Sequence, residues 1–371
     1  MTWESQPIVP PWKGVVDNIP SIVAPPSSFS SATGFWIDKQ RLKTFLTKIG
    51  VQVPPNLGVV IGLRTFTDAV GNLHTIFVTP TQAYFFVPPA AGYYDSTGIP
   101  ASKFSLTPIS FEVYQNVLFL TNGSDKILAI DGSAYSSSQS LPNNGTSFFL
   151  GKIAGRLLAL NLVEPQPSQL GSTNYPRRFR WSAVNDATNW TAFDAGVADI
   201  SEIEDNITGY ATQGALGYIY RNKGVTVITP TGSISPTFFL ENYSGGEQGV
   251  GVGCFFPYSL AQFGNMTVFA AEDDIYMFNP LLGPFQAIGG SATRSIYLDL
   301  QKSTGYCIGA LLPTLTYGIT SLQYWLIIPL AASAPGEHLN CKVWIYSFES
   351  QTWMSQLLPY VITCIANVAV S

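Results

Sequence analysis

Short apolar runs separated by polar turns dominate the chain from about residue 57 onward. β-Branched and aromatic residues are frequent within the runs, and Gly, Pro, Asn and Asp interrupt them. This pattern is typical of β-strands joined by tight turns. One arrangement recurs six times: a short apolar strand, a polar turn, and a second strand with aromatic residues. The six copies lie at 74–87, 116–131, 155–184, 215–230, 265–280 and 323–353.

The spacing of these hairpins indicates a repeating structural unit. A four-stranded unit of about 40–50 residues is the signature of propeller blades, and longer copies carry insertions in their loops. Two face-packed sheets would not need the same hairpin six times. The sequence therefore predicts an all-β protein, a β-propeller of about six blades over 57–371. We expect the strand-like segments 57–66 and 360–370 to close the ring by completing one blade together.

The N-terminal part has a different composition. Residues 1–35 are rich in Pro and Ser, which predicts an extended arm. Residues 36–56 are expected to form a short helical segment and a linker, with the helix over 36–50 and Gly50 as its stop. The apolar residues at helical spacing there are Leu42, Phe45, Leu46 and Ile49.

Composition favours a subunit of a permanent assembly. Charged residues are 11% of the chain, against roughly 25% in typical soluble domains, while hydrophobic residues reach 46%. A surface covered by partners needs less charge than a freely diffusing protein. The net charge of −5 argues against a surface that holds nucleic acid by neutralising phosphates, although DNA could pass such a surface without sticking.

Several kinds of chemistry find no motif. The four cysteines lie far apart without a CxxC pair, and two histidines cannot build a histidine-rich metal site. We therefore expect no metal and no cofactor. The N-terminus has no apolar signal core, and no run of eighteen apolar residues suggests a membrane span.

The densest polar and aromatic stretch is RRFRWSAVNDATNW at 177–190. It has the residue types of a sialidase Asp-box turn, but Ser182 and Asp186 are four residues apart rather than two. Sialidases also clamp a carboxylate with converging arginines. In a strand, the neighbours Arg177 and Arg178 would face opposite sides. The stretch therefore predicts strand and turn structure rather than catalysis.

Two groups of acidic residues are equally weak candidates for a functional site. Residues 272–274 occupy the turn of the fifth hairpin, and residues 199–205 precede the fourth. Paired carboxylates can bind calcium or transfer protons. Without EF-hand spacing or a partner histidine, turns stabilised by Asp side chains explain both groups better. We expect no enzymatic activity.

A resemblance to a known family rests on two stretches. One is GRLLALNL at 155–162 followed by PRRFRWSAVNDATNW at 176–190, and the other is CKVWIYSFESQTW at 341–353. Both resemble the strand–turn–aromatic patterns of the β-propeller tail hub, or nozzle, proteins of short-tailed bacteriophages, the packaged-DNA stabilisation family.

The resemblance implies a structural virion protein without cofactors. Proteins of that family form a ring, usually a homohexamer, below the portal and adaptor in the virion tail, assembled in the host bacterial cytoplasm. They contact the tail adaptor and distal components such as a needle, spike or fibre. They continue the channel for double-stranded DNA without reading its sequence, and help retain and release the genome.

The same stretch supplies the candidate interface residues. Asn185 and Asp186 are expected to shape the turn between two strands, and the tryptophans to pack a blade against its neighbour or a loop against the blade. The candidates for subunit contacts are Arg177, Arg178, Arg180, Trp181 and Trp190. A carbohydrate-binding or sialidase-like propeller for receptor recognition remains the alternative.

Overall fold

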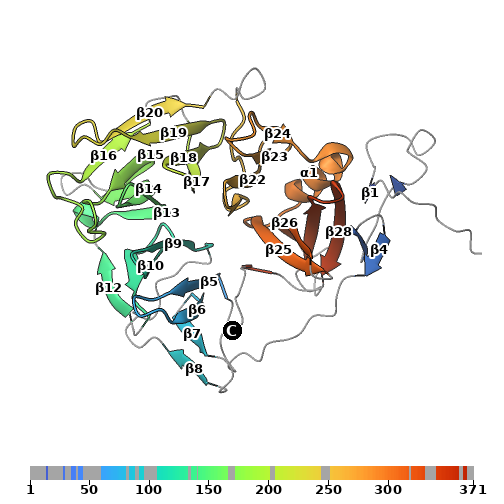
Figure 1. The fold of residues 1–371 in the computed structure, drawn as a ribbon, viewed down its shortest axis with the longest axis horizontal. Helices are drawn as coiled ribbons and strands as arrows, with labels where there is room; N and C mark the ends of the chain where they lie inside the picture. The colour runs from blue at the N-terminus through green and yellow to red at the C-terminus, as the bar shows by residue number, and fades with distance from the viewer. Residues whose placement is uncertain are drawn as a thin grey trace, which may run out of the picture.

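Six antiparallel sheets of four strands each form a ring of blades, a six-bladed β-propeller (Figure 1). The computed structural model describes residues 14–15, 28–29, 35–38, 41–44, 60–80, 83–87, 92–95, 107–132, 135–139, 141–165, 172–200, 205–243, 251–316, 319–330, 340–358 and 362–365. The predicted fold class is confirmed.

Each blade uses four consecutive strands, and the first strand lies innermost. Blades 1 to 3 comprise β5 (Gly62–Thr67), β6 (Leu73–Val78), β7 (Ala83–Val87) and β8 (Gly92–Asp95); β9 (Ser110–Tyr114), β10 (Val117–Thr121), β11 (Ile127–Ile130) and β12 (Tyr135–Gln139); β13 (Thr146–Ile153), β14 (Arg156–Pro165), β15 (Ser172–Trp181) and β16 (Gly196–Asp199). Blades 4 to 6 comprise β17 (Ile207–Gln213), β18 (Leu216–Arg221), β19 (Val225–Pro230) and β20 (Phe238–Asn242); β21 (Ala261–Phe263), β22 (Met266–Ala270), β23 (Ile275–Phe278) and β24 (Gln286–Ala287); β25 (Ile308–Thr316), β26 (Ile319–Leu330), β27 (Asn340–Ser347) and β28 (Thr352–Leu358). All six predicted hairpins are confirmed as the middle two strands of a blade.

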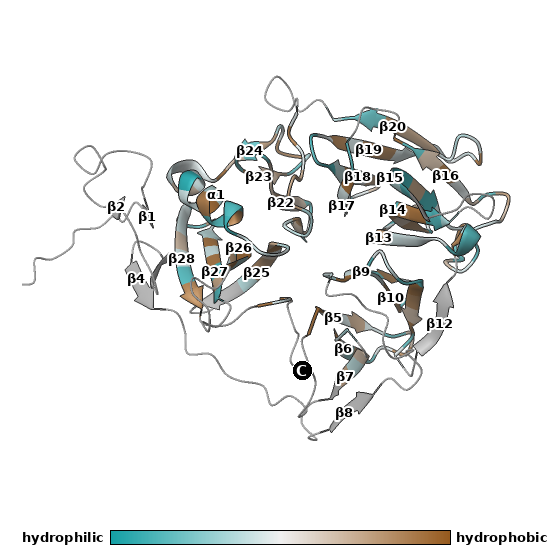
Figure 2. Cartoon of the chain, turned by 180° about the vertical axis from the view of Figure 1, so that it is seen from behind, coloured by the Kyte–Doolittle hydropathy of each residue, from teal (hydrophilic) through white to brown (hydrophobic). Residues whose placement is uncertain are grey.

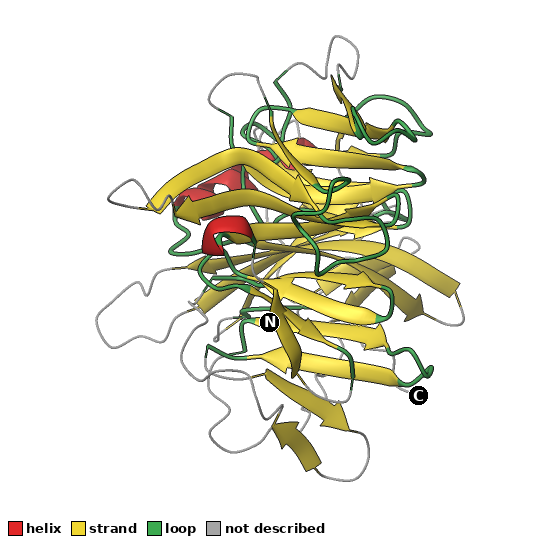
Figure 3. Ribbon diagram, turned by 90° about the vertical axis from the view of Figure 1, so that its left-hand side faces the viewer, coloured by secondary structure: helices red, strands yellow, loops and turns green. Residues whose placement is uncertain are grey.

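The antiparallel topology gives the ring two different ends. One end, here called the turn face, carries the connections from the first to the second strand and from the third to the fourth strand of every blade. The opposite end carries the second-to-third connections and the links between blades, including helix α1 (Thr293–Gln301). In Figure 3 the helical segments lie at one end of the strands and green loops at the other.

Apolar clusters between neighbouring blades hold the ring together, and in Figure 2 the brown apolar positions lie mostly within the strands. Five clusters join blades 1 to 2, 2 to 3, 3 to 4, 4 to 5 and 5 to 6. One buried pair from each, in that order, is Ile76 and Leu118, Phe119 and Leu157, Phe179 and Ile219, Tyr220 and Phe269, Val268 and Leu326. Burying one such side chain contributes about 1.5–3 kcal/mol.

The seam between blade 6 and blade 1 is built differently. Among the described residues, no apolar cluster joins these two blades directly. The free face of blade 6, with Ile327 and Val343 at its centre, packs instead against Ile362 and Ile365. The Thr363 hydroxyl donates a hydrogen bond to the Val60 carbonyl, immediately before blade 1. A short C-terminal segment therefore fills the seam.

Two expectations about the ends of the chain are wrong. Within the described residues no shared blade closes the ring, because every blade is complete within its own four strands and residues 362–365 form no strand. Residues 57–59, 360–361 and 366–370 of the two expected closing segments lie outside the described part. Where a helix was expected over 36–50, the described residues instead form a hairpin of strands β3 (Phe35–Asp38) and β4 (Arg41–Thr44), and residues 39–40 and 45–50 lie outside the described part. The aromatic and β-branched run FWI favours a strand, and a single short helix without a partner is marginally stable.

The remaining described elements are small. The predicted arm contributes β1 (Gly14–Val15) and β2 (Ser28–Phe29), a parallel pair, and its other residues lie outside the described part. Strands β1 and β3 lie beside β28 at the outer edge of blade 6 (Figure 1). Within the described residues, no helix is both long enough and apolar enough to cross a membrane.

Candidate functional site

The arginine-rich stretch lies on β15 and its loop to β16, and most of its charge is satisfied inside blade 3. Arg178 Nη1 lies 2.9 Å from Glu164 Oε2 on β14, and Arg180 Nε contacts the other Glu164 oxygen. Arg178 also makes two bonds, of 2.7 and 2.8 Å, to the Asp199 carboxylate on β16. Arg177 is exposed. Arg178 and Arg180, two residues apart on β15, thus reach the same carboxylate, as expected of residues on one face of a strand.

This cluster balances a buried negative charge. Glu164 is 1% exposed, so an unpaired carboxylate at its position would be costly. The Arg178 guanidinium lies 3.8 Å from the centre of the Tyr175 ring, and its hydrogen bonds hold the pKa of Asp199 below the usual value. The same bonds raise the pKa of Arg178. A carboxylate-binding clamp would need free guanidinium groups, and those of Arg178 and Arg180 are already bonded to Glu164.

The two tryptophans pack between blades. Trp190 is 4% exposed and belongs to the cluster between blades 2 and 3. Trp181 lies on the other side of blade 3, with its ring edge-on to Phe238 of blade 4 at 5.2 Å between centroids. The loop between them turns at Asn185, whose φ is +57°, and Asp186 accepts hydrogen bonds from the amide and hydroxyl of Thr188. The expected packing and turn roles are observed.

Arg156, which the sequence reasoning did not select, anchors this loop. It is 5% exposed and donates hydrogen bonds to the carbonyls of Ser182, at 2.9 Å, and Asp194, at 2.6 Å. The Asp194 carboxylate lies 3.3 Å from the same nitrogen. A Gly-Arg pair that opens an apolar strand was its only sequence signal.

The acidic groups serve turns and ion pairs. Asp274 Oδ1 accepts hydrogen bonds from the amides of Ile275 and Gly289, and burial raises the pKa of this carboxyl. Asp205 lies 3.3 Å from Arg221 Nη1. Within the described residues, no three His, Cys, Asp or Glu side chains are grouped so that they could hold a metal ion.

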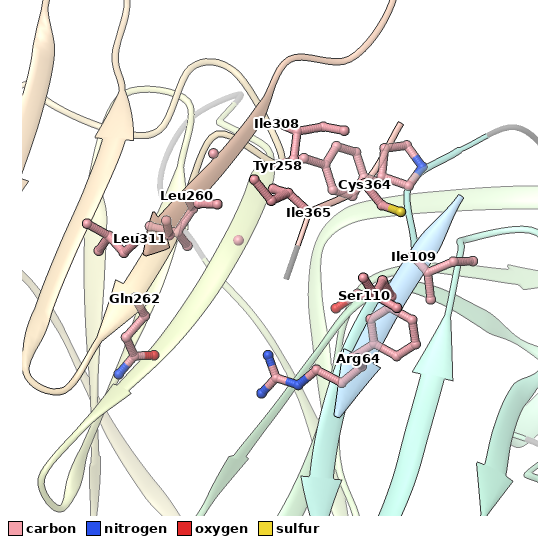
Figure 4. Close-up of a pocket in the computed structure, with 18 of the residues that line it drawn as sticks. Arg64, Ile109, Ser110, Tyr258, Leu260, Gln262, Ile308, Leu311, Cys364 and Ile365 are labelled. Atoms are coloured by element: carbon pink, nitrogen blue, oxygen red, sulfur yellow. The ribbon is translucent and has the colours of Figure 1, made fainter. Parts of the chain in front are cut away.

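The central channel of the propeller forms a cavity of about 640 Å³ (Figure 4). The first strand of every blade lines it, together with residues 363–365 from the seam. The end near the opposite face is mainly apolar and is lined by Ile109, Tyr258, Ile308, Cys364 and Ile365. The part nearer the turn face is polar and is lined by Arg64, Thr65, Glu112, Tyr210 and Gln262. No sequence motif indicates this cavity, since its wall combines residues from six strands that are distant along the chain.

Three charged groups gather near the polar part of the channel. Burial raises the pKa of the Glu112 carboxyl, and the ammonium group of Lys152, 3.1 Å away, opposes that rise. Arg64 is exposed to the channel. Among the described residues, no carboxylate lies within ion-pair distance of the Arg64 guanidinium. With Arg64 and Lys152 against Glu112, the channel mouth thus has one more positive than negative charge.

Comparisons with known proteins show no family for this chain. The sequence matches no model of a known protein family and no curated protein. Similar solved structures include the Neurospora crassa Pan2 WD40 domain, with 10% identity, a TM-score of 0.39 and coverage of 84% of this chain and 80% of that chain. The WD40 domain of fission yeast SCAP has 9% identity, a TM-score of 0.32 and coverage of 77% and 84%. The tricorn protease has 11% identity and a TM-score of 0.31; the match covers 76% of this chain and 25% of that one.

Proposed function

We propose that this chain is a structural subunit without enzymatic activity, a tail hub or nozzle protein that forms a ring below the portal and adaptor of a short-tailed bacteriophage. The sequence resemblance given above suggests the family. The distribution of exposed apolar side chains is the structural observation that carries the assembly role.

These side chains are concentrated on the turn face. Eight of the fourteen large hydrophobic residues that are exposed in the described part lie in or beside its connections. They are Val70, Leu73, Val184, Phe193, Ile234, Phe263, Leu281 and Leu282. Exposed apolar side chains gathered at one end of a molecule are typical of a protein–protein contact surface. The low charge of the chain agrees with surfaces that are covered in an assembly.

The interior of blade 3 weakens the enzymatic alternative. A sialidase-like site needs arginines that are free to bind a substrate carboxylate. Arg178 and Arg180 already bind Glu164 within their own sheet. Arg177 alone of the three remains available for a contact with a neighbouring subunit.

Native mass measurement of the purified chain tests the proposal. A ring, expected as a hexamer, has several times the subunit mass and should bind the tail adaptor protein. A strictly monomeric chain that does not bind the adaptor would contradict the hub assignment. Cleavage of a sialoglycan, or binding to it, would instead favour the receptor-recognition alternative.

A further inference from the structure

The central channel presents an arginine that its own blade does not use. Arg64 lies in the middle of β5, and Figure 4 shows its side chain reaching from that strand toward the open space of the cavity. The Glu112 carboxyl interacts electrostatically with Arg64, and it is engaged by Lys152 at 3.1 Å. Two cations and one carboxylate leave a local charge of +1 in a chain whose net charge is −5. An anionic group is the complement of this mouth.

The channel wall also presents backbone amide and carbonyl groups. The first strand of every blade stands at the end of its sheet, so no strand of the described part pairs with its inner edge. One amide on these edges, that of Gly309, is already bonded to the Tyr258 carbonyl. Such an edge presents amide and carbonyl groups that can bind an extended peptide.

The cavity has the size and polarity of a ligand site. Its volume of about 640 Å³ lies within the range of roughly 300–1,000 Å³ usual for binding pockets. The apolar end, closed in part by Cys364 and Ile365, can accept a hydrophobic side chain. At the rim, Phe263 lines the cavity and is 46% exposed.

From these features we infer that the central channel binds an extended acidic segment of a partner protein, which enters from the turn face. Its carboxylate pairs with the Arg64 guanidinium in the two-pronged geometry that arginine forms with carboxylates. Its backbone bonds to the inner strand edges, and its apolar side chains fill the far end. A free carboxylic acid could use the arginine but not the strand edges, so the segment of a protein is favoured. The inference does not depend on the hub assignment.

A peptide array probed with the full-length chain tests this inference. Each apolar hexapeptide is made in two forms, with Glu or with Gln at one position. We expect the Glu form to bind about tenfold more tightly, the worth of one charge-assisted hydrogen-bonded pair. Arg64→Gln should abolish this preference and leave the circular dichroism spectrum unchanged. Arg294→Gln, which removes an exposed arginine of α1 at the opposite end, should keep it.

Three results would overturn the inference. They are the absence of any bound peptide, equal binding of the Glu and Gln forms, and a preference that survives in Arg64→Gln. Free glutarate provides a further arm. It should displace a bound peptide only at concentrations at least about a hundredfold above that peptide's own Kd, because it lacks a backbone for the strand edges. Displacement at equal concentrations would assign the channel to small acids instead.

Discussion

Glu164 shows how a single buried charge fixes the role of its neighbours. The carboxylate is 1% exposed, and both of its oxygens are bonded by arginines from the adjacent strand. Removing one partner of a buried ion pair leaves an uncompensated charge, which is far more costly than losing a surface pair. The first role of Arg178 and Arg180 is therefore to stabilise blade 3, and a contact with another subunit would come second.

Alanine substitution separates these roles. The double variant R178A/R180A should lose about 3–5 kcal/mol of unfolding free energy, because Glu164 is left buried and unpaired. Arg177→Ala should change the unfolding free energy by less than about 0.5 kcal/mol, as expected of an exposed residue. Urea unfolding measures both. Adding Glu164→Leu to the double variant should recover part of the loss; a double variant as stable as the wild type would refute this account.

The turn between β5 and β6 holds a pH-dependent contact. Asp68 Oδ2 lies 2.8 Å from His74 Nε2, and this hydrogen bond, with help from the amides of Asn72 and Val70, lowers the pKa of Asp68 from 3.8 to about 2. A carboxylate whose pKa falls on folding stabilises the protein above its unfolded pKa. That contribution is lost as the pH falls through the folded value.

The wild type should therefore lose stability between about pH 4 and pH 2 in part through Asp68. In His74→Ala the pKa of Asp68 should rise toward its ordinary value, and the loss in this window should shrink. Thermal unfolding from pH 2 to 5 measures the effect, with Asp68→Asn as the variant that removes the titrating group. Parallel profiles for all three proteins would show that the contact has no energetic weight.

At the scale of elements, the seam between blades 6 and 1 is the blade interface that, within the described residues, has no direct apolar cluster. Five blade interfaces are continuous apolar clusters, whereas this one is bridged by residues 362–365. Segments with few buried contacts open more readily than the rest of a structure. We expect the seam to be the first place at which the propeller opens.

Thr363→Val tests the seam by replacing one hydroxyl group with a methyl group. Loss of the hydrogen bond to the Val60 carbonyl should cost about 1 kcal/mol. Hydrogen exchange should speed up in β5 and in residues 362–365, while β17 on the far side of the ring stays unchanged. Thr304→Val, at an exposed threonine between blades 5 and 6, is the matched control. Faster exchange throughout the ring in the Thr363 variant would argue against a local opening.

How far the sequence predicts the elements depends on the range of the interactions that form them. Hairpins were predictable because alternating apolar residues and polar turns act over a dozen residues, and all six were found. The helix expected over 36–50 failed because apolar spacing alone does not decide between helix and strand, and the aromatic and β-branched run FWI at 35–37 forms strand β3. Helix α1, with Ile296 and Leu300 buried, was missed because its apolar face is only two turns long.

The site shows the same limit more strongly. The turn role of Asp186 and the packing of Trp190 followed from local patterns. The partner of the arginines did not, since Glu164 lies fourteen and sixteen residues before them and pairs only through the sheet. The central channel depends on six strands that are distant along the chain. No periodic pattern in the sequence reveals which residues of these strands come together.

At the scale of the whole molecule, the two ends of the ring differ in what they expose. The turn face carries Phe193 at 83% exposure and Leu281 at 77%, in the connections of blades 3 and 5. Exposing apolar side chains of this kind to water costs free energy, and a bound partner removes that cost by covering them. If the chain assembles through this face, polar residues there should weaken the assembly without unfolding the subunit.

The double variant F193S/L281S puts this expectation to the test. Both side chains are exposed, so each substitution should change the unfolding free energy by less than about 0.5 kcal/mol. If the proposed subunit ring forms through this face, native mass spectrometry should show the variant shifted toward monomers, because the apolar contacts between subunits are lost. Leu357→Ser, at a residue 50% exposed near the opposite end of blade 6, should assemble like the wild type. Equal assembly of all three proteins would place the contact surface elsewhere on the propeller, and loss of assembly in Leu357→Ser alone would place it on the opposite face.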